Sequence, residues 1–112
     1  MELLHLPSVG EVIELSDKLT GFRGDRLNRP CLCYARREVS INVVPLSREG
    51  ELPGSGYEIP ASAAYGLDSP SFIVDHIAVI GYFIATSASS LGHLGMEILP
   101  EALEYIWTVI DP

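Results

Sequence analysis

The apolar residues of this chain fall into short runs, and turn-forming residues bound each run. The two clearest runs cover residues 30–35 and 40–46, and the short polar segment 36–38 separates them. Short apolar runs bounded by turn-forming residues predict strands. Pro30 is compatible with this prediction because proline is tolerated at the first residue of a strand.

Further segments of the chain have the same character. We predict strands over residues 9–15, 57–59 and 72–80, the last of them continuing to residue 84 after a kink at Gly81. Polar segments that contain glycine and proline separate these strands and predict loops and turns. They cover residues 16–28, 47–56, 60–71 and 87–95.

The end of the chain has a helical periodicity. An apolar stripe recurs there at the spacing of an α-helix, formed by Leu99, Leu103, Ile106 and Ile110. Pro100 opens this helix at the position where proline is best tolerated. Short strands followed by one amphipathic helix predict a mainly β fold, a small, strongly curved barrel with a C-terminal α-helix.

The length and composition favour one globular unit. A chain of 112 residues has room for one core, so we expect a single domain over residues 1–112. An apolar fraction of 47% argues against disorder of the whole chain. The N-terminus lacks the pattern of a signal peptide, and the longest apolar stretch, residues 72–85, is too short to span a bilayer. We therefore expect a soluble, cytoplasmic protein that does not associate with membranes.

The sequence gives no support for several common chemistries. It contains no phosphate-binding loop, dinucleotide-binding glycine motif or serine-esterase elbow. Cys31 and Cys33 are expected on one face of a predicted strand, as small buried residues. A metal site would need further ligands, and the histidines, at positions 5, 76 and 93, have no metal-binding spacing. We expect no metal and no cofactor.

Charge is distributed unevenly along the chain. The net charge of −8 taken alone argues against nucleic-acid binding. However, all seven basic residues lie between residues 18 and 48, a window in which the only acids are Asp25 and Glu38. A domain polarised in this way can attract a polyanion at one face. The alternative is that these arginines are solvated loop charges without a specific partner.

Several short motifs occur in order along the chain. They are Gly10-Glu11 before the first strand, residues 29–34 (Arg-Pro-Cys-Leu-Cys-Tyr), residues 43–47 (Val-Val-Pro-Leu-Ser), residues 75–79 (Asp-His-Ile-Ala-Val) and residues 92–94 (Gly-His-Leu). Together they resemble the MazF/PemK toxins, the endoribonucleases of type II toxin–antitoxin systems, and the chain looks like a divergent member. The resemblance implies an SH3-like barrel, a homodimer, metal-independent cleavage of single-stranded RNA, and neutralisation by a cognate antitoxin protein.

Cleavage of this kind uses the adjacent 2′-hydroxyl of the RNA as the nucleophile. It needs a base, an acid for the leaving oxygen, and positive charge beside the phosphorane. Arg29 is the candidate for the charge, and Ser47 for a hydrogen bond to the phosphate or to water. Asp75 and His76 are the candidate bases. The candidates for RNA binding are Phe22, by stacking on a base, and the basic residues Arg23, Arg26 and Arg48.

Each of these residues also has a purely structural interpretation. Arg29 would be a surface charge at a strand entrance, and Ser47 would begin a turn. His76 would be a hydrogen-bonded structural histidine, and Phe22 would anchor the basic loop to the barrel.

Two positions depart from the family pattern. His76 stands where the family has glutamine, and Ala78 stands where it has arginine. These departures, together with the net charge, favour an alternative function, in which a catalytically inactive barrel of the same fold binds a protein partner.

Overall fold

Two long strands, β2 (Arg29–Arg36) and β3 (Ser40–Ser47), form an antiparallel hairpin at the centre of the fold. The computed structural model describes residues 5–48 and 56–112. Within these residues the sheet has seven strands in the order β4-β5-β3-β2-β1-β7, and β6 also pairs with β3. The remaining strands are β1 (Glu11–Leu15), β4 (Tyr57–Ile59), β5 (Ser71–Ile73), β6 (Ala78–Gly81) and β7 (Ser89–His93). The prediction of a mainly β fold with a C-terminal helix is confirmed.

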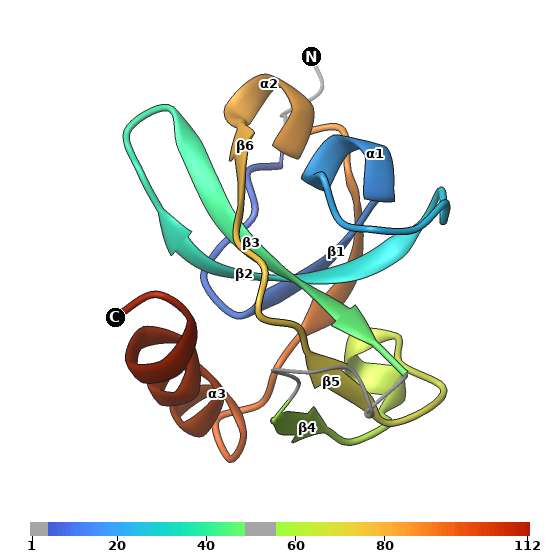
Figure 1. The fold of residues 1–112 in the computed structure, drawn as a ribbon, viewed down its shortest axis with the longest axis vertical. Coiled ribbons are helices and arrows are strands. Elements are labelled where there is room, and N and C mark those ends of the chain that lie inside the picture. Colours follow the sequence, from blue (N-terminus) through green and yellow to red (C-terminus); the bar gives the residue numbers. More distant parts are fainter. Residues whose placement is uncertain (1–4, 49–55) are drawn as a thin grey trace.

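On the side away from β2, the strand β3 pairs with two different strands. Its first half pairs with β6, with Ser40 opposite Gly81, and its end pairs with β5, with Ser47 opposite Phe72. Because β5 and β6 follow one another along the same strand, the sheet bends around β3. The result is the curled half-barrel seen in Figure 1.

Both faces of the central strands are buried. Along β2, Leu32 belongs to one core cluster, whereas Cys31 and Cys33 belong to a second cluster on the opposite face. Along β3, the adjacent residues Val43 and Val44 divide in the same way. Because neither face of the sheet meets water at these residues, the two strands are continuous apolar runs in the sequence. The prediction that both cysteines share one buried face is confirmed.

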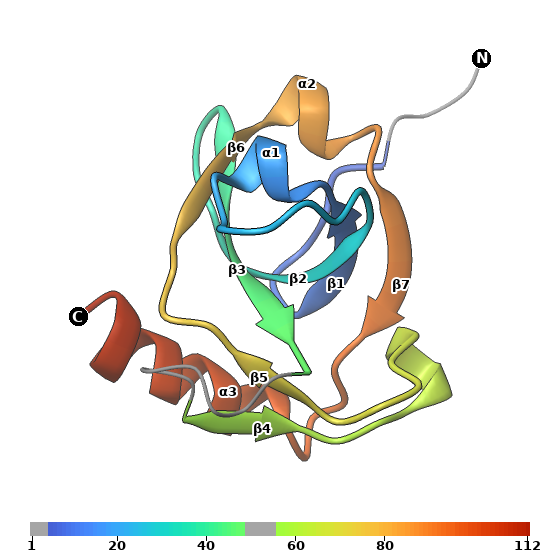
Figure 2. The same cartoon turned by 45° about the vertical axis from the view of Figure 1, so that its right-hand side comes forward.

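Short helices close the ends of the half-barrel. They are α1 (Asp17–Thr20), η1 (Ala63–Tyr65), α2 (Tyr82–Ala85) and α3 (Leu99–Tyr105), which continues as the π-helical segment η2 (Ile106–Ile110). Figure 2 shows α1 and α2 at one end of the curled sheet and α3 with β4 at the other. The predicted apolar stripe is confirmed, because Ile106 and Ile110 are buried and Leu99 and Leu103 pack against the same cluster. No helix within residues 5–48 and 56–112 is long and apolar enough to cross a membrane.

The prediction of one buried strand over residues 72–80 is wrong. The chain leaves the sheet after β5 and rejoins it at β6, with Asp75 and His76 between them. A charged and a polar side chain at this point favour a bend in which Asp75 reaches solvent. The predicted continuation to residue 84 is also wrong, because the chain turns at Gly81 into α2.

The segment predicted to turn at residues 87–95 instead contains β7. This strand pairs with β1 and is rich in serine and glycine. A Cβ atom at Gly92 would overlap the carbonyl oxygen of Ala64, so the small residues here permit a close approach of two backbones. The predicted loop over residues 16–28 contains α1, and most of the predicted loop over residues 47–56 lies outside the described residues.

Candidate functional site

An open hollow of about 510 Å³ lies where the start of β2 and the end of β3 meet the loop after α1. It brings together six of the eight site residues predicted from the sequence. They are Phe22, Arg23, Arg26, Arg29, Ser47 and Arg48, with Gly24 completing the lining. Asp75 and His76 do not line it. We call this feature the arginine hollow.

The register of the central hairpin explains why two distant motifs meet here. Arg29 is the first residue of β2 and Ser47 the last of β3, and antiparallel pairing places these two ends together. Arg29 Nη1 donates a hydrogen bond to the carbonyl oxygen of Leu46, at 3.2 Å. Ser47 is almost fully buried and takes part in interactions of its own.

Asp17, at the start of α1, holds the guanidinium group of Arg29. Arg29 donates from Nε to Oδ1 of Asp17, at 2.6 Å, and from Nη2 to Oδ2, at 3.1 Å. The Asp17 side chain is fully buried and also accepts from the backbone N–H of Arg26, at 3.0 Å. The hydrogen bond from Arg29 is the main cause that lowers the pKa of Asp17, so this carboxylate stays ionised.

The pairing with Asp17 reduces both the number of N–H donors and the net charge that Arg29 can present to a ligand. A guanidinium group has five N–H donors. Within the described residues, Asp17 and Leu46 accept from three of them, which leaves two for a ligand in the hollow. The charge of Arg29, however, is already balanced by Asp17. Arg48 also has an acidic partner, the exposed Asp68, so within the described residues the excess positive charge of the hollow comes from Arg23 and Arg26.

Phe22 packs between Arg29 and His76. The Cζ atom of Arg29 lies 4.6 Å from the centroid of its ring, a cation–π contact. The ring of His76 meets it edge-on, at a centroid distance of 5.8 Å and an interplanar angle of 64°. Phe22 thus tethers the basic loop, and one face of its ring is already covered by Arg29.

His76 is oriented by the backbone of α1. Its Nε2 lies 2.9 Å from the carbonyl oxygen of Thr20. A carbonyl only accepts, so Nε2 carries the proton of this bond and Nδ1 is the basic nitrogen of the neutral ring. The Phe22 ring lies between His76 and Arg29, and Asp75 is exposed to solvent. Neither candidate base therefore lines the arginine hollow, although His76 contacts Phe22, which does.

The position that departs most from the toxin pattern is part of the core. Ala78 is buried in the cluster that also contains Cys31 and Cys33. An arginine at this position would place a charge among apolar side chains, which is costly without a partner. Burial raises the pKa of Cys31 to about 12 and that of Cys33 to about 11, so both remain thiols at neutral pH. The described residues hold no group of three or more side chains suited to a metal ion.

The Gly10-Glu11 motif has a structural role. Gly10 adopts a φ of 98°, which favours glycine, and lies beside Leu99. Burial raises the pKa of Glu11, but hydrogen bonds from Ser90, Ser8 and His5 outweigh it and hold the pKa below its ordinary value. Glu11 therefore ties the N-terminal segment to β1 and β7.

Asp17 is the residue of the site that sequence reasoning missed. One local signal was present, because Ser16 precedes it and caps α1 by accepting from the N–H of Leu19. A capping serine predicts a helix start, but it does not reveal that the next residue is buried against an arginine twelve positions later.

Known proteins add no identification. No protein-family model matches the chain, and no curated protein matches it.

Proposed function

We propose that the protein is a metal-independent endoribonuclease toxin of the MazF/PemK type, acting on single-stranded RNA. One observation carries this proposal: a single hollow gathers four arginines with an aromatic ring and a hydroxyl group. The members are Arg23, Arg26, Arg29, Arg48, Phe22 and Ser47. Guanidinium groups bind phosphate oxygens, and an aromatic side chain beside them suits a strand whose bases are unpaired.

The proposed reaction is an internal transfer at one phosphodiester. The 2′-hydroxyl loses its proton to a base and its oxygen bonds to phosphorus, while the bond from phosphorus to the 5′-oxygen breaks and that oxygen takes up a proton from solvent water. The products are a 2′,3′-cyclic phosphate and a 5′-hydroxyl. The two remaining donors of Arg29 and the Ser47 hydroxyl would stabilise the charge on the phosphorane.

His76 is the proposed base, acting through Nδ1, because Thr20 holds Nε2 in its protonated form. Asp75, its exposed neighbour, is the second candidate. Because Phe22 contacts both His76 and Arg29, an RNA strand lying over this ring would meet the proposed base and the arginines together. Homodimer formation would extend the surface available to such a strand.

An acidic, disordered tail of a cognate antitoxin is the proposed inhibitor. Such a tail would compete with RNA for the same cationic hollow and would fold as it binds. Because the proposed substrate is cellular RNA, we place the protein in the cytoplasm.

The test is cleavage of single-stranded RNA in the presence of EDTA, with the ends of the products sequenced. We expect discrete cuts with cyclic phosphate ends, reduced at least tenfold in the double variant Arg23→Ala/Arg48→Ala. Arg36→Ala is the matched control, since this exposed arginine ends β2 away from the hollow. Absence of cleavage at every protein concentration, or equal cleavage by both variants, contradicts the proposal.

A second candidate function is a catalytically inactive barrel that binds a protein partner. The observation that favours it is that neither Asp75 nor His76 lines the arginine hollow, together with the balancing of Arg29 by Asp17. Salt dependence distinguishes the two candidates. RNA binding that weakens steeply with salt supports the toxin, whereas tight protein capture without RNA affinity supports the binding module.

A further inference from the structure

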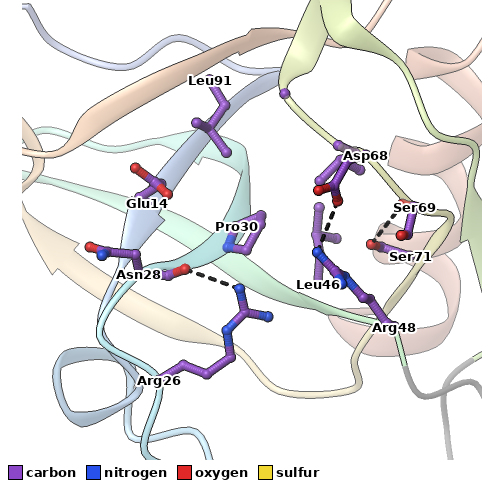
Figure 3. Close-up of a pocket in the computed structure, with 12 residues that line it drawn as sticks. Glu14, Arg26, Asn28, Pro30, Leu46, Arg48, Asp68, Ser69, Ser71 and Leu91 are labelled. Atoms are coloured by element: carbon purple, nitrogen blue, oxygen red, sulfur yellow. Dashed lines mark hydrogen bonds and ion pairs between the residues drawn. The ribbon is translucent and has the colours of Figure 1, made fainter.

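A second, smaller hollow adjoins the arginine hollow. It measures about 170 Å³ and shares Arg26 and Arg48 with its neighbour. Figure 3 shows the two guanidinium groups toward one end of it and Glu14 and Leu91 toward the other, with Pro30 between them. Both arginines therefore lie within reach of a ligand that occupies the two hollows.

The size and walls of the smaller hollow suit a single flat ring system. Pockets for drug-sized ligands measure roughly 300 to 1,000 Å³, and this one is clearly smaller. Pro30, Leu46 and Leu91 supply apolar surface, and no aromatic side chain lines it. A base entering here would be recognised through hydrogen bonds at its edge rather than by stacking on a ring.

Two carboxylates, those of Asp68 and Glu14, line this hollow. Asp68 accepts from Arg48 Nη2 at 2.8 Å, which orients the guanidinium between the two hollows. Glu14, on β1, is partly buried and has no hydrogen-bond or ion-pair partner among residues 5–48 and 56–112. A partly buried carboxylate gains most from a ligand that donates two hydrogen bonds to it.

Among the four RNA bases, guanine alone presents two adjacent N–H donors on one edge, at N1 and at the exocyclic N2. Adenine and cytosine present one amino group beside a ring nitrogen that accepts, and this lone pair would face the carboxylate. Uracil presents one N–H flanked by two carbonyl groups. The acceptor pattern at Glu14 therefore selects guanine.

We propose that the smaller hollow is a guanine-binding subsite in which the Glu14 carboxylate accepts from N1 and N2 of the base. The phosphate that joins this guanosine to its neighbour lies within reach of Arg26 and Arg48 at the arginine hollow. This inference rests on the proposed RNA-cleaving function and gives it a nucleotide preference.

The experiment is an NMR titration of the ¹⁵N-labelled protein with guanosine and uridine 5′-monophosphates. We expect the guanosine nucleotide to shift the backbone amides of Glu14, Ser71 and Leu91 and uridine monophosphate to leave them unchanged. Glu14→Gln keeps the size of the side chain but lacks one acceptor, and it should weaken guanosine monophosphate binding at least tenfold. Glu58→Gln, on the exposed face of β4, is the matched control.

A parallel RNA-cleavage assay distinguishes failure of the guanine subsite from failure of the proposed function. Cuts beside guanine that lose this preference in Glu14→Gln support the subsite. Cuts with the same nucleotide preference in the wild type and Glu14→Gln overturn the subsite and leave the proposed function standing. If guanosine monophosphate shifts the Glu14 amide and no RNA is cut, the guanine site holds and the proposed function fails. No shift of these amides, or equal affinity in both proteins, overturns the inference.

Discussion

Two arginine–aspartate pairs contribute their arginines to the arginine hollow, and the pairs differ in burial and in the number of their hydrogen bonds. Arg29 and Asp17 form two hydrogen bonds, and their side chains are 10% and 0% exposed. Arg48 and Asp68 form one, at 2.8 Å, and their side chains are 58% and 84% exposed. The first pair lies among apolar and backbone groups, and the second lies in water.

This difference assigns different roles to residues of the same type. A largely buried charge that loses its partner regains little solvation, so Asp17 and Arg29 depend on one another for the stability of the fold. An exposed pair exchanges its partner for water or for a phosphate at little cost. Arg48 is therefore free to bind a ligand, whereas Arg29 mainly shapes the surface on which a ligand would lie.

The largest effect is expected from Asp17→Asn. This variant leaves the charge of Arg29 buried without compensation, and it should lower the free energy of unfolding by about 3 to 5 kcal/mol. Urea denaturation of the purified protein measures this change. The double replacement Asp17→Leu/Arg29→Met is the control, and it should recover most of the loss because no buried charge remains. A loss below 1 kcal/mol for Asp17→Asn would remove the distinction between the two pairs.

The Asp17–Arg29 pair also makes the stability of the fold depend on pH. The pKa of Asp17 in the folded protein lies below its ordinary value of 3.8. A group with a lowered folded pKa contributes stability above its unfolded pKa and loses it as the pH falls through the folded pKa. The contribution of Asp17 is thus complete at neutral pH and declines below about pH 4. Thermal unfolding between pH 6 and pH 2 should show a shallower decline in Asp17→Asn, with part of the decline retained because the Glu11 pKa is also lowered. Identical slopes in both proteins would contradict this.

A smaller effect is expected from Phe22→Leu. Leucine preserves apolar contact but removes the ring over which Arg29 lies at 4.6 Å, and the loss should be about 1 kcal/mol of unfolding free energy. The same substitution in an Asp17→Leu/Arg29→Met background should cost less, because the cation is absent. Equal losses in both backgrounds would show that the contact is apolar packing alone.

The smallest effect is expected at the exposed pair. A double-mutant cycle with Arg48→Ala and Asp68→Ala should give a coupling energy of about 0.2 to 1 kcal/mol at low salt, falling toward zero in 1 M sodium chloride. The thermal unfolding of the four proteins measures it. Coupling that exceeds 2 kcal/mol and resists salt would place Arg48 with Arg29 as a structural residue.

Sequence patterns predicted those parts of the molecule that depend on local order. The burial of residues 30–35 and 40–46 follows from their short apolar runs, and the buried stripe of the final helix follows from helical periodicity. The meeting of Arg29 with Ser47 depends in addition on the antiparallel pairing of these two strands, which the structure shows.

The features that were not predicted depend on contacts between segments far apart in the chain. Such contacts produce no periodic pattern in the sequence. The division of residues 71–81 between β5 and β6 is decided by which half of β3 each strand meets. Asp17 looked like one more polar loop residue, although its side chain is fully buried. Ser89–His93 looked like a turn because the glycine that permits close packing is also the residue that turns favour.

The sharing of the β2–β3 hairpin by two core clusters has a consequence for motion. Loss of α3 would uncover only one face of the hairpin, and loss of α2 only the other. The amide protons of Leu32 and Cys33, on a strand paired on both sides by β1 and β3, should therefore exchange with solvent only when the whole molecule unfolds, whereas those of α3 and β6 exchange through smaller openings. Deuterium would then enter the ends of the half-barrel first and reach its central hairpin last, so the walls of the arginine hollow at Arg29 and Ser47 rest on the slowest-opening part of the chain.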